Sequence, residues 1–131
     1  MKQLICLVLL LTANFLTAQT EIKNVDAKTF KTYIADKNNV LIDLRTDDEI
    51  ARKGKIPGAK QIDFFKPNAE KLIDSLDRKK TYLVYCAGGG RSTQCAELME
   101  KKEFKKVINL EKGFDDWKKQ GFETEQKPAG K

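Results

Sequence analysis

A cysteine followed by a glycine cluster, at the end of an apolar run, constrains this chain more than any other feature. Residues 81–85 read Thr-Tyr-Leu-Val-Tyr, which is typical of a buried strand, and residues 93–101 predict a helix. Between them the chain reads Cys86-Ala87-Gly88-Gly89-Gly90-Arg91-Ser92. Glycines let such a loop curl so that successive backbone N–H groups point inward. The sequence therefore predicts a strand, a tight loop and a helix, with an anion-binding nest at the corner.

Cys86 lies at the rim of this predicted nest. The free N–H groups and the positive dipole end of the following helix favour a thiolate, which is the nucleophilic form of cysteine. The chain contains no histidine, so a cysteine–histidine pair is excluded. Backbone amides and cationic side chains must therefore activate Cys86. The alternative is a small buried cysteine before a glycine turn.

The spacing of Cys86 and Arg91, with four residues between them, resembles the active-site loop of the rhodanese family. In that family the cysteine accepts a sulfur atom and carries it as a persulfide. Related phosphatases and arsenate reductases have one more residue in the loop, which makes a wider cradle for a tetrahedral oxyanion. The shorter loop of this chain therefore favours sulfur transfer over phosphate chemistry.

Two further stretches resemble the same family. The first carries an Asp-x-Arg pair, a glutamate and a Gly-x-Ile-Pro-Gly-Ala segment, at Asp43, Arg45, Glu49 and residues 54–59. Lys55 replaces the histidine that is common in this segment. The second stretch keeps Gly113 and Trp117 at the spacing of a closing Gly-Gly-x-x-x-Trp motif, with Lys112 in place of the first glycine.

The resemblance covers residues 22–122 and implies a rhodanese-like α/β domain. Such a domain has three layers, with helices on both faces of a central parallel sheet of about five strands, and the alternation of strand and helix patterns supports the same class. Strands are expected at residues 21–25, 40–42, 61–62, 81–85 and 107–109, and helices at 27–36, from 46, at 68–76, at 92–102 and up to 121. Asp26 is expected to cap the first helix, Thr46 and Glu49 to form a capping box at the second, and Leu72, Ile73 and Leu76 to form the buried stripe of the third. Since the carboxyl ends of parallel strands share one edge, residues 43–45, 86–91 and 110–113 should form one site around Cys86.

Several residues near this site allow two interpretations. Asp43 and Arg45 either form an ion pair that pins a strand to a loop or line the rim of the cysteine pocket. Arg91 either binds an anionic donor or braces the loop. Cys95 is expected to be a buried helix residue, with a resolving thiol for Cys86 as the alternative.

A loop at residues 64–67 contains Phe64 and Phe65. We expect both aromatic side chains to pack in the core. The alternative is that one of them faces the mouth of the cysteine pocket.

The N-terminus predicts a secretory signal peptide. Lys2 precedes an apolar run at residues 4–11, and small residues precede an expected cleavage site after Ala18. The run is short for a membrane span, although an uncleaved anchor is the alternative. We therefore expect residues 1–18 to be removed and the protein to be periplasmic or secreted, without stable membrane insertion. The polar segment 123–131 is expected to be a disordered tail.

Charge and composition limit the partners. The net charge is +6, from 25 basic and 19 acidic residues that are interleaved along the chain. This pattern indicates a solvated surface with a mild attraction for anionic substrates. No motif of interleaved aromatic and basic residues is present, so nucleic-acid binding is not expected. The absence of histidine also excludes a histidine-ligated metal site, and we expect neither a metal nor an organic cofactor.

The resemblance implies a sulfurtransferase that works through a cysteine persulfide. Cys86 would take a sulfane sulfur from a small anionic donor, such as thiosulfate or a polysulfide. It would pass the sulfur to cyanide or to a thiol of a small molecule or a protein. The expected substrate-binding residues are Ala87, Gly88, Gly89, Gly90, Arg91 and Ser92. The alternatives are a non-catalytic binding or sensing module and, on the same scaffold, a cysteine-based phosphatase or arsenate reductase.

Overall fold

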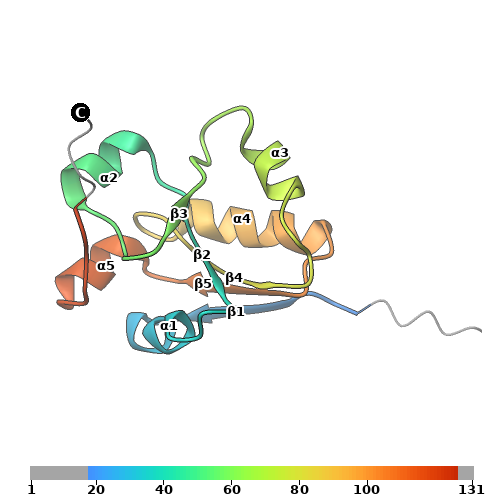
Figure 1. The fold of residues 1–131 in the computed structure, drawn as a ribbon, viewed down its shortest axis with the longest axis horizontal. Helices are drawn as coiled ribbons and strands as arrows, with labels where there is room; N and C mark the ends of the chain where they lie inside the picture. The colour runs from blue at the N-terminus through green and yellow to red at the C-terminus, as the bar shows by residue number, and fades with distance from the viewer. Residues whose placement is uncertain (1–17, 127–131) are drawn as a thin grey trace, which may run out of the picture.

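The computed structural model describes residues 18–126, which form a parallel five-stranded sheet with helices on both faces. The strand order is β1-β5-β4-β2-β3 (Figure 1). The strands are β1 (Glu21–Val25), β2 (Val40–Asp43), β3 (Lys60–Gln61), β4 (Thr81–Tyr85) and β5 (Lys106–Leu110). The helices are α1 (Ala27–Ile34), α2 (Asp47–Lys53), α3 (Ala69–Asp74), α4 (Gly90–Lys101) and α5 (Gly113–Lys119). The predicted α/β class with a central parallel sheet is confirmed.

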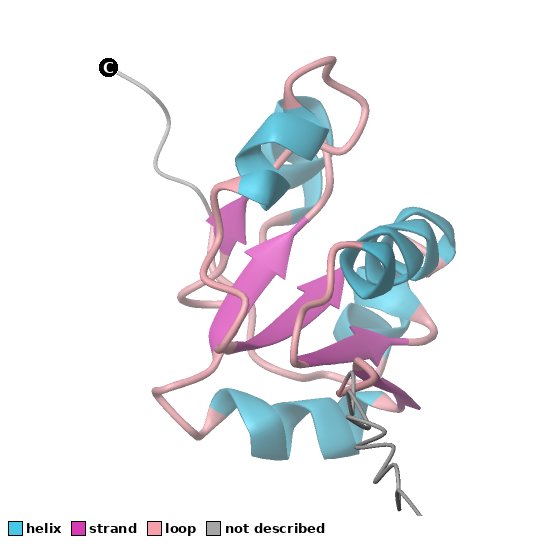
Figure 2. Cartoon of the chain, turned by 90° about the vertical axis from the view of Figure 1, so that its right-hand side faces the viewer, coloured by secondary structure: helices cyan, strands magenta, loops and turns pink. Residues whose placement is uncertain are grey.

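Strand β4 shows how alternate residues supply the two layers of the core. Tyr82, Val84 and then Cys86 face a cluster formed with α3 and α4. Leu83 and Tyr85 face the other cluster, which includes side chains of α1 and α5. Both clusters are apolar, and β4 is buried on both faces, as expected of an inner strand in a parallel sheet. Figure 2 shows helices on opposite sides of the sheet.

Local capping signals fix two helix starts. Asp26 precedes α1, and its carboxylate accepts the Thr29 N–H at 2.8 Å, as the sequence predicts. Thr46 and Glu49 form the predicted capping box at α2. Helix α4 begins at Gly90, two residues before its predicted start, so the glycine loop is shorter than expected.

Two apolar side chains are more exposed than the sequence suggested. Phe65 is 70% exposed, so the expectation that it packs in the core is wrong, whereas Phe64 packs against the core. Leu72 is also exposed, because the buried face of the short helix α3 consists of Ala69 and Ile73.

The described ends of the chain bear on the predicted leader and tail. Residues 1–17 of the predicted signal peptide and residues 127–131 of the predicted disordered tail lie outside the described residues. Within the expected tail, Glu125 pairs with Lys55 through two backbone hydrogen bonds of 2.8 Å. Between residues 18 and 126, no helix is both long enough and apolar enough to cross a membrane.

Candidate active site

Cys86 directly follows β4, at the carboxyl edge of the sheet, where the backbone turns into α4. Gly89 N–H donates a hydrogen bond to Cys86 Sγ at 3.1 Å, and the thiol donates to Ser92 Oγ at 3.6 Å. The cysteine is only 1% exposed. The structure therefore brings Cys86, Gly89 and Ser92 together, as the sequence predicts for the loop.

The carbonyl of Gly89 anchors the loop to α4. It accepts hydrogen bonds from Thr93 N–H at 3.0 Å, Thr93 Oγ1 at 2.8 Å and Ser92 Oγ at 3.1 Å. Asn109 of β5 donates to Thr93 Oγ1 at 3.2 Å and so supports this arrangement from the sheet. With its carbonyl held by three donors, Gly89 cannot easily turn its N–H away from the sulfur.

The first turn of α4 provides further donors beside the sulfur. Among residues 18–126, the bond from Thr93 N–H is the first backbone bond of this helix, so Gly90, Arg91 and Ser92 keep N–H groups without a backbone acceptor. Free N–H groups at a helix start stabilise a negative charge that lies close to them. The loop can therefore hold an anion on or next to Cys86.

The start of α5 closes against the other side of the loop. Phe114 N–H donates to Cys86 O at 2.8 Å, and Asp115 N–H donates to Ala87 O at 3.1 Å. Gly113 has a φ of +72°, and a Cβ on it would lie 2.3 Å from Ala87 O, so only glycine fits this approach. Gly113 of the motif noted in the sequence thus contacts the backbone of the cysteine loop directly, whereas Trp117 packs against Phe30 and Phe122.

Arg91, in the first turn of α4, is paired with Glu49 of α2. Its guanidinium forms two hydrogen bonds with the Glu49 carboxylate, at 2.7 and 2.8 Å. It also lies over the exposed ring of Phe65, 4.7 Å from the ring centroid. Since the fork of the guanidinium is occupied by Glu49, this geometry matches the bracing interpretation of Arg91 rather than donor binding.

The ion pair of Glu49 and Arg91 makes the free energy of unfolding depend on pH. Hydrogen bonds from Arg91 and the Thr46 N–H hold the pKa of Glu49 at about 2, below its usual 4.5. A carboxylate with a lowered folded-state pKa stabilises the protein above its unfolded pKa, and this stabilisation is lost as the pH falls from about 4.5 through about 2. The shift corresponds to about 2 kcal/mol at neutral pH, after allowance for the partial exposure of the pair.

Glu49→Gln is therefore expected to lower the free energy of unfolding at neutral pH and to flatten its decline between about pH 5 and about pH 2. The glutamine carbonyl can still accept the Thr46 N–H of the capping box, but the amide nitrogen cannot accept from Arg91, so the variant loses the charge together with one Arg91 hydrogen bond. Urea unfolding across this pH range measures the difference. Asp48→Asn, at an exposed neighbour in α2, serves as the control and should decline as the wild type does. Equal acid sensitivity of wild type and Glu49→Gln would count against the pair.

Asp43 and Arg45 form a fully buried ion pair below the site. Asp43 accepts hydrogen bonds from the Arg45 guanidinium at 2.8 and 3.0 Å and from the Tyr85 hydroxyl at 2.7 Å. Both residues are 0% exposed. Burial and the nearby carboxylate raise the pKa of the Tyr85 hydroxyl, so it remains a donor. The pair is therefore linked to Cys86 through Tyr85, the residue that precedes it, and through Phe114, whose ring lies 3.9 Å from the Arg45 guanidinium.

Cys95 lies on the buried face of α4 and is 1% exposed. Burial raises the pKa of its thiol to about 12, so it stays protonated at neutral pH. Both described cysteines are free thiols. Among the described residues, no group of three or more cysteine, aspartate or glutamate side chains is placed to hold a metal ion.

Sequence reasoning missed three residues that shape the site. Tyr85 bonds to Asp43, and Thr93 and Asn109 anchor Gly89. Tyr85 and Asn109 lie in apolar strand runs, where the one available signal was that each has a polar group that needs a hydrogen-bond partner when buried. Thr93 was indistinguishable from an ordinary first-turn helix residue.

A cysteine over the free amides of a helix start, at the carboxyl edge of a parallel sheet, defines an α/β domain with a candidate nucleophile in an anion-binding loop. The family model described as "Rhodanese-like domain" matches residues 26–120. The chain belongs to this family.

Relatives and a solved structure agree with this assignment. "Putative sulfurtransferase YtwF" of Bacillus subtilis is 35% identical over 109 residues, covering 82% of this chain and 97% of the relative. A protein named "Sulfurtransferase" from Allochromatium vinosum is 31% identical over 103 residues, covering 77% and 92%. The crystal structure of a rhodanese-related protein from Thermoplasma volcanium shares the fold, with a TM-score of 0.69 at 24% identity, over 80% of this chain and 99% of that one. These relatives support a sulfur-transfer role for the domain.

Proposed function

We propose that this protein is a sulfurtransferase that carries a sulfane sulfur on Cys86 as a persulfide. The observation that supports it is the 3.1 Å hydrogen bond from Gly89 N–H to Cys86 Sγ, beside the free N–H groups at the start of α4. The same donors can stabilise the negative charge on the outer sulfur of a persulfide. We also propose that the protein is exported, as its N-terminal sequence suggests.

The proposed reaction has two displacement steps. The Cys86 thiolate attacks the outer sulfur of thiosulfate, the sulfur–sulfur bond of the donor breaks, and sulfite leaves with its electron pair. An acceptor thiolate, or cyanide, then attacks the outer sulfur of the Cys86 persulfide. The persulfide bond breaks, and the Cys86 thiolate is regenerated. A polysulfide replaces thiosulfate by the same route, and neither step needs an external oxidant or reductant.

Peptide-mapping mass spectrometry after incubation with thiosulfate tests the proposal. We expect the peptide that contains Cys86 to gain one sulfur atom and to lose it again when a thiol or cyanide is added. Cys86→Ser should gain no sulfur, whereas the control Cys95→Ala should load as the wild type does, because Cys95 is buried and its raised pKa keeps it a thiol. Absence of the adduct from wild-type protein would contradict the proposal.

A non-catalytic binding module is the second candidate, and the burial of Cys86, which is 1% exposed, favours it. A sulfur donor must pass the glycine loop to reach the buried sulfur atom of Cys86. Alkylation of the folded protein by iodoacetamide measures this access. Alkylation and sulfur loading of Cys86 support the transferase, whereas a cysteine that is neither alkylated nor loaded supports the binding module. Hydrolysis of a phosphate ester without a sulfur adduct would instead indicate a phosphatase.

A further inference from the structure

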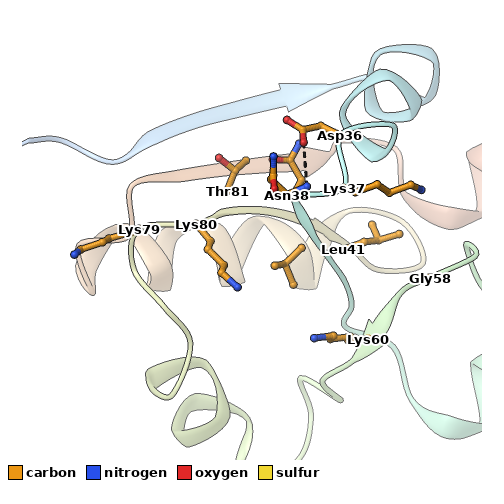
Figure 3. A pocket seen from close by; sticks show the side chains of 11 residues that line it. Asp36, Lys37, Asn38, Leu41, Gly58, Lys60, Lys79, Lys80 and Thr81 are labelled. Carbon is orange, nitrogen blue, oxygen red and sulfur yellow. Dashed lines mark hydrogen bonds between the residues drawn. The ribbon is translucent and has the colours of Figure 1, made fainter.

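A hollow of about 700 Å³ lies at the amino ends of β2 and β4, at the opposite edge of the sheet from Cys86. Four lysines from three segments line it, namely Lys37, Lys60 and the adjacent pair Lys79 and Lys80. Figure 3 shows Lys60 and Lys80 extending into the space between their segments, whereas Lys37 and Lys79 extend outward on either side of it. The amino edge of the sheet, opposite the edge at which Cys86 lies, thus carries a concentration of positive charge.

The fold places these lysines together through adjacent turns. Residues 36–39 lead into β2, and residues 77–80 lead into β4, which pairs directly with β2. Each turn is held by an aspartate, since Asp36 accepts the Asn38 N–H at 3.0 Å and Asp77 accepts the Lys79 N–H at 2.9 Å. Lys60 joins them from β3, on the other side of β2. The pairing of the strands therefore sets the distances between the lysines, and no contact between the lysine side chains is needed.

The positive charge of the hollow is not neutralised by partners in the described part of the chain. None of the four lysines forms an ion pair there, whereas other lysines such as Lys55 and Lys102 do. Asp36 is the acidic residue that lines the hollow, and its carboxylate already accepts a backbone N–H. The remaining polar lining consists of Asn38, Asn39 and Thr81, which can donate hydrogen bonds.

We propose that this hollow is a second anion site, which binds a ligand that carries several phosphate groups. Lysine ammonium groups bind phosphate as point charges, without the fixed fork of arginine, which is absent from this lining. A phosphate group carries more negative charge than a carboxylate, so several phosphates best match a lining with four lysines. The lysines lie at the amino ends of three neighbouring strands about 4.8 Å apart, Lys37 before β2, Lys79 and Lys80 before β4 and Lys60 in β3, so the negative charge of the ligand must be spread over on the order of 10 Å. A single small anion such as thiosulfate is too short to meet them all.

Isothermal titration calorimetry with sodium tripolyphosphate tests the site. We expect Lys60→Gln/Lys80→Gln to lower the affinity at least about tenfold, since two positive charges next to the ligand are lost. The matched control Lys101→Gln/Lys119→Gln removes the same charge from the exposed ends of α4 and α5, and should change the affinity less than about twofold. Cys86→Ser should bind as the wild type does.

Sedimentation with phosphatidylcholine vesicles that contain phosphatidic acid separates the two sources of phosphate. Binding of tripolyphosphate that depends on Lys60 and Lys80 supports a soluble ligand. Binding of vesicles alone, with the same dependence, supports a lipid headgroup as the source. The proposal is overturned if neither probe binds, if both variants bind equally well, or if a single-stranded oligonucleotide binds in preference to both probes.

Discussion

Gly89→Ala is expected to abolish sulfur loading of Cys86 and to lower the free energy of unfolding by about 3 kcal/mol. Gly89 has a φ of +102°, which L-residues with a side chain rarely adopt. A Cβ at this position would lie 2.1 Å from the Glu111 carbonyl oxygen, which belongs to the backbone between β5 and α5. Because backbone cannot move aside as a flexible side chain can, the loop itself must shift.

Such a shift would displace the amide that, within residues 18–126, donates a hydrogen bond to the sulfur. Gly89 N–H donates to Cys86 Sγ, and Gly89 O holds the loop to α4, so displacing this residue disturbs both. Gly88→Ala is the matched control, because a Cβ there meets no atom within 4 Å. Its stability should stay within about 0.5 kcal/mol of the wild type.

Urea unfolding and peptide-mapping mass spectrometry measure the two effects. Loss of sulfur loading in Gly89→Ala protein that is still folded would show that the loop geometry, and not only the presence of Cys86, is needed. A Gly89→Ala protein that is as stable as the wild type and loads sulfur equally well would refute the role given to this glycine.

The sequence predicts those parts of the fold that depend on near neighbours. β4 occupies residues 81–85 as expected, because an apolar run between turns is sufficient to define a buried strand. The capping box at Thr46 and Glu49 was also predictable, since its two residues are three apart. The convergence of strand ends around Cys86 followed from the parallel sheet alone.

The contacts that complete the site join residues far apart in the sequence. Arg91 meets Glu49, and Tyr85 meets Asp43, each across 42 positions, and no periodicity identifies such partners. Glu49 was recognised for its role in capping α2, which concealed its second role as partner of Arg91. Phe65 was expected in the core because it is large and apolar, but the short loop leaves its ring outside, beneath the Arg91 guanidinium.

The buried pair of Asp43 and Arg45 is held by more contacts than any exposed ion pair of the described residues. Besides Asp43, the guanidinium donates to Gly54 O at 2.7 Å and lies 3.9 Å from the centroid of the Phe114 ring. One of its nitrogens, Nη1, already lacks a hydrogen-bond partner among the described residues. Loss of another partner would therefore leave still more of the buried guanidinium without hydrogen bonds. Removing the carboxylate would leave an uncompensated positive charge in the core.

Asp43→Ala is therefore expected to lower the free energy of unfolding by about 3–5 kcal/mol. Urea unfolding of the wild type and the variant measures the loss. Asp48→Ala, which removes the partner of Arg52 in a pair whose side chains are 71% and 75% exposed, is the control and should show no measurable change.

The double variant Asp43→Ala/Arg45→Met separates the cost of the stranded charge from the loss of packing. If the stranded guanidinium causes the instability, its removal makes the double variant more stable than Asp43→Ala alone. A double variant that is less stable than the single one would show instead that Arg45 contributes mainly through its contacts with Phe114 and Gly54. The pair is linked to the cysteine loop by the Tyr85 hydroxyl, which donates to Asp43. If the stranded guanidinium causes the instability, iodoacetamide should therefore alkylate Cys86 faster in Asp43→Ala than in the double variant.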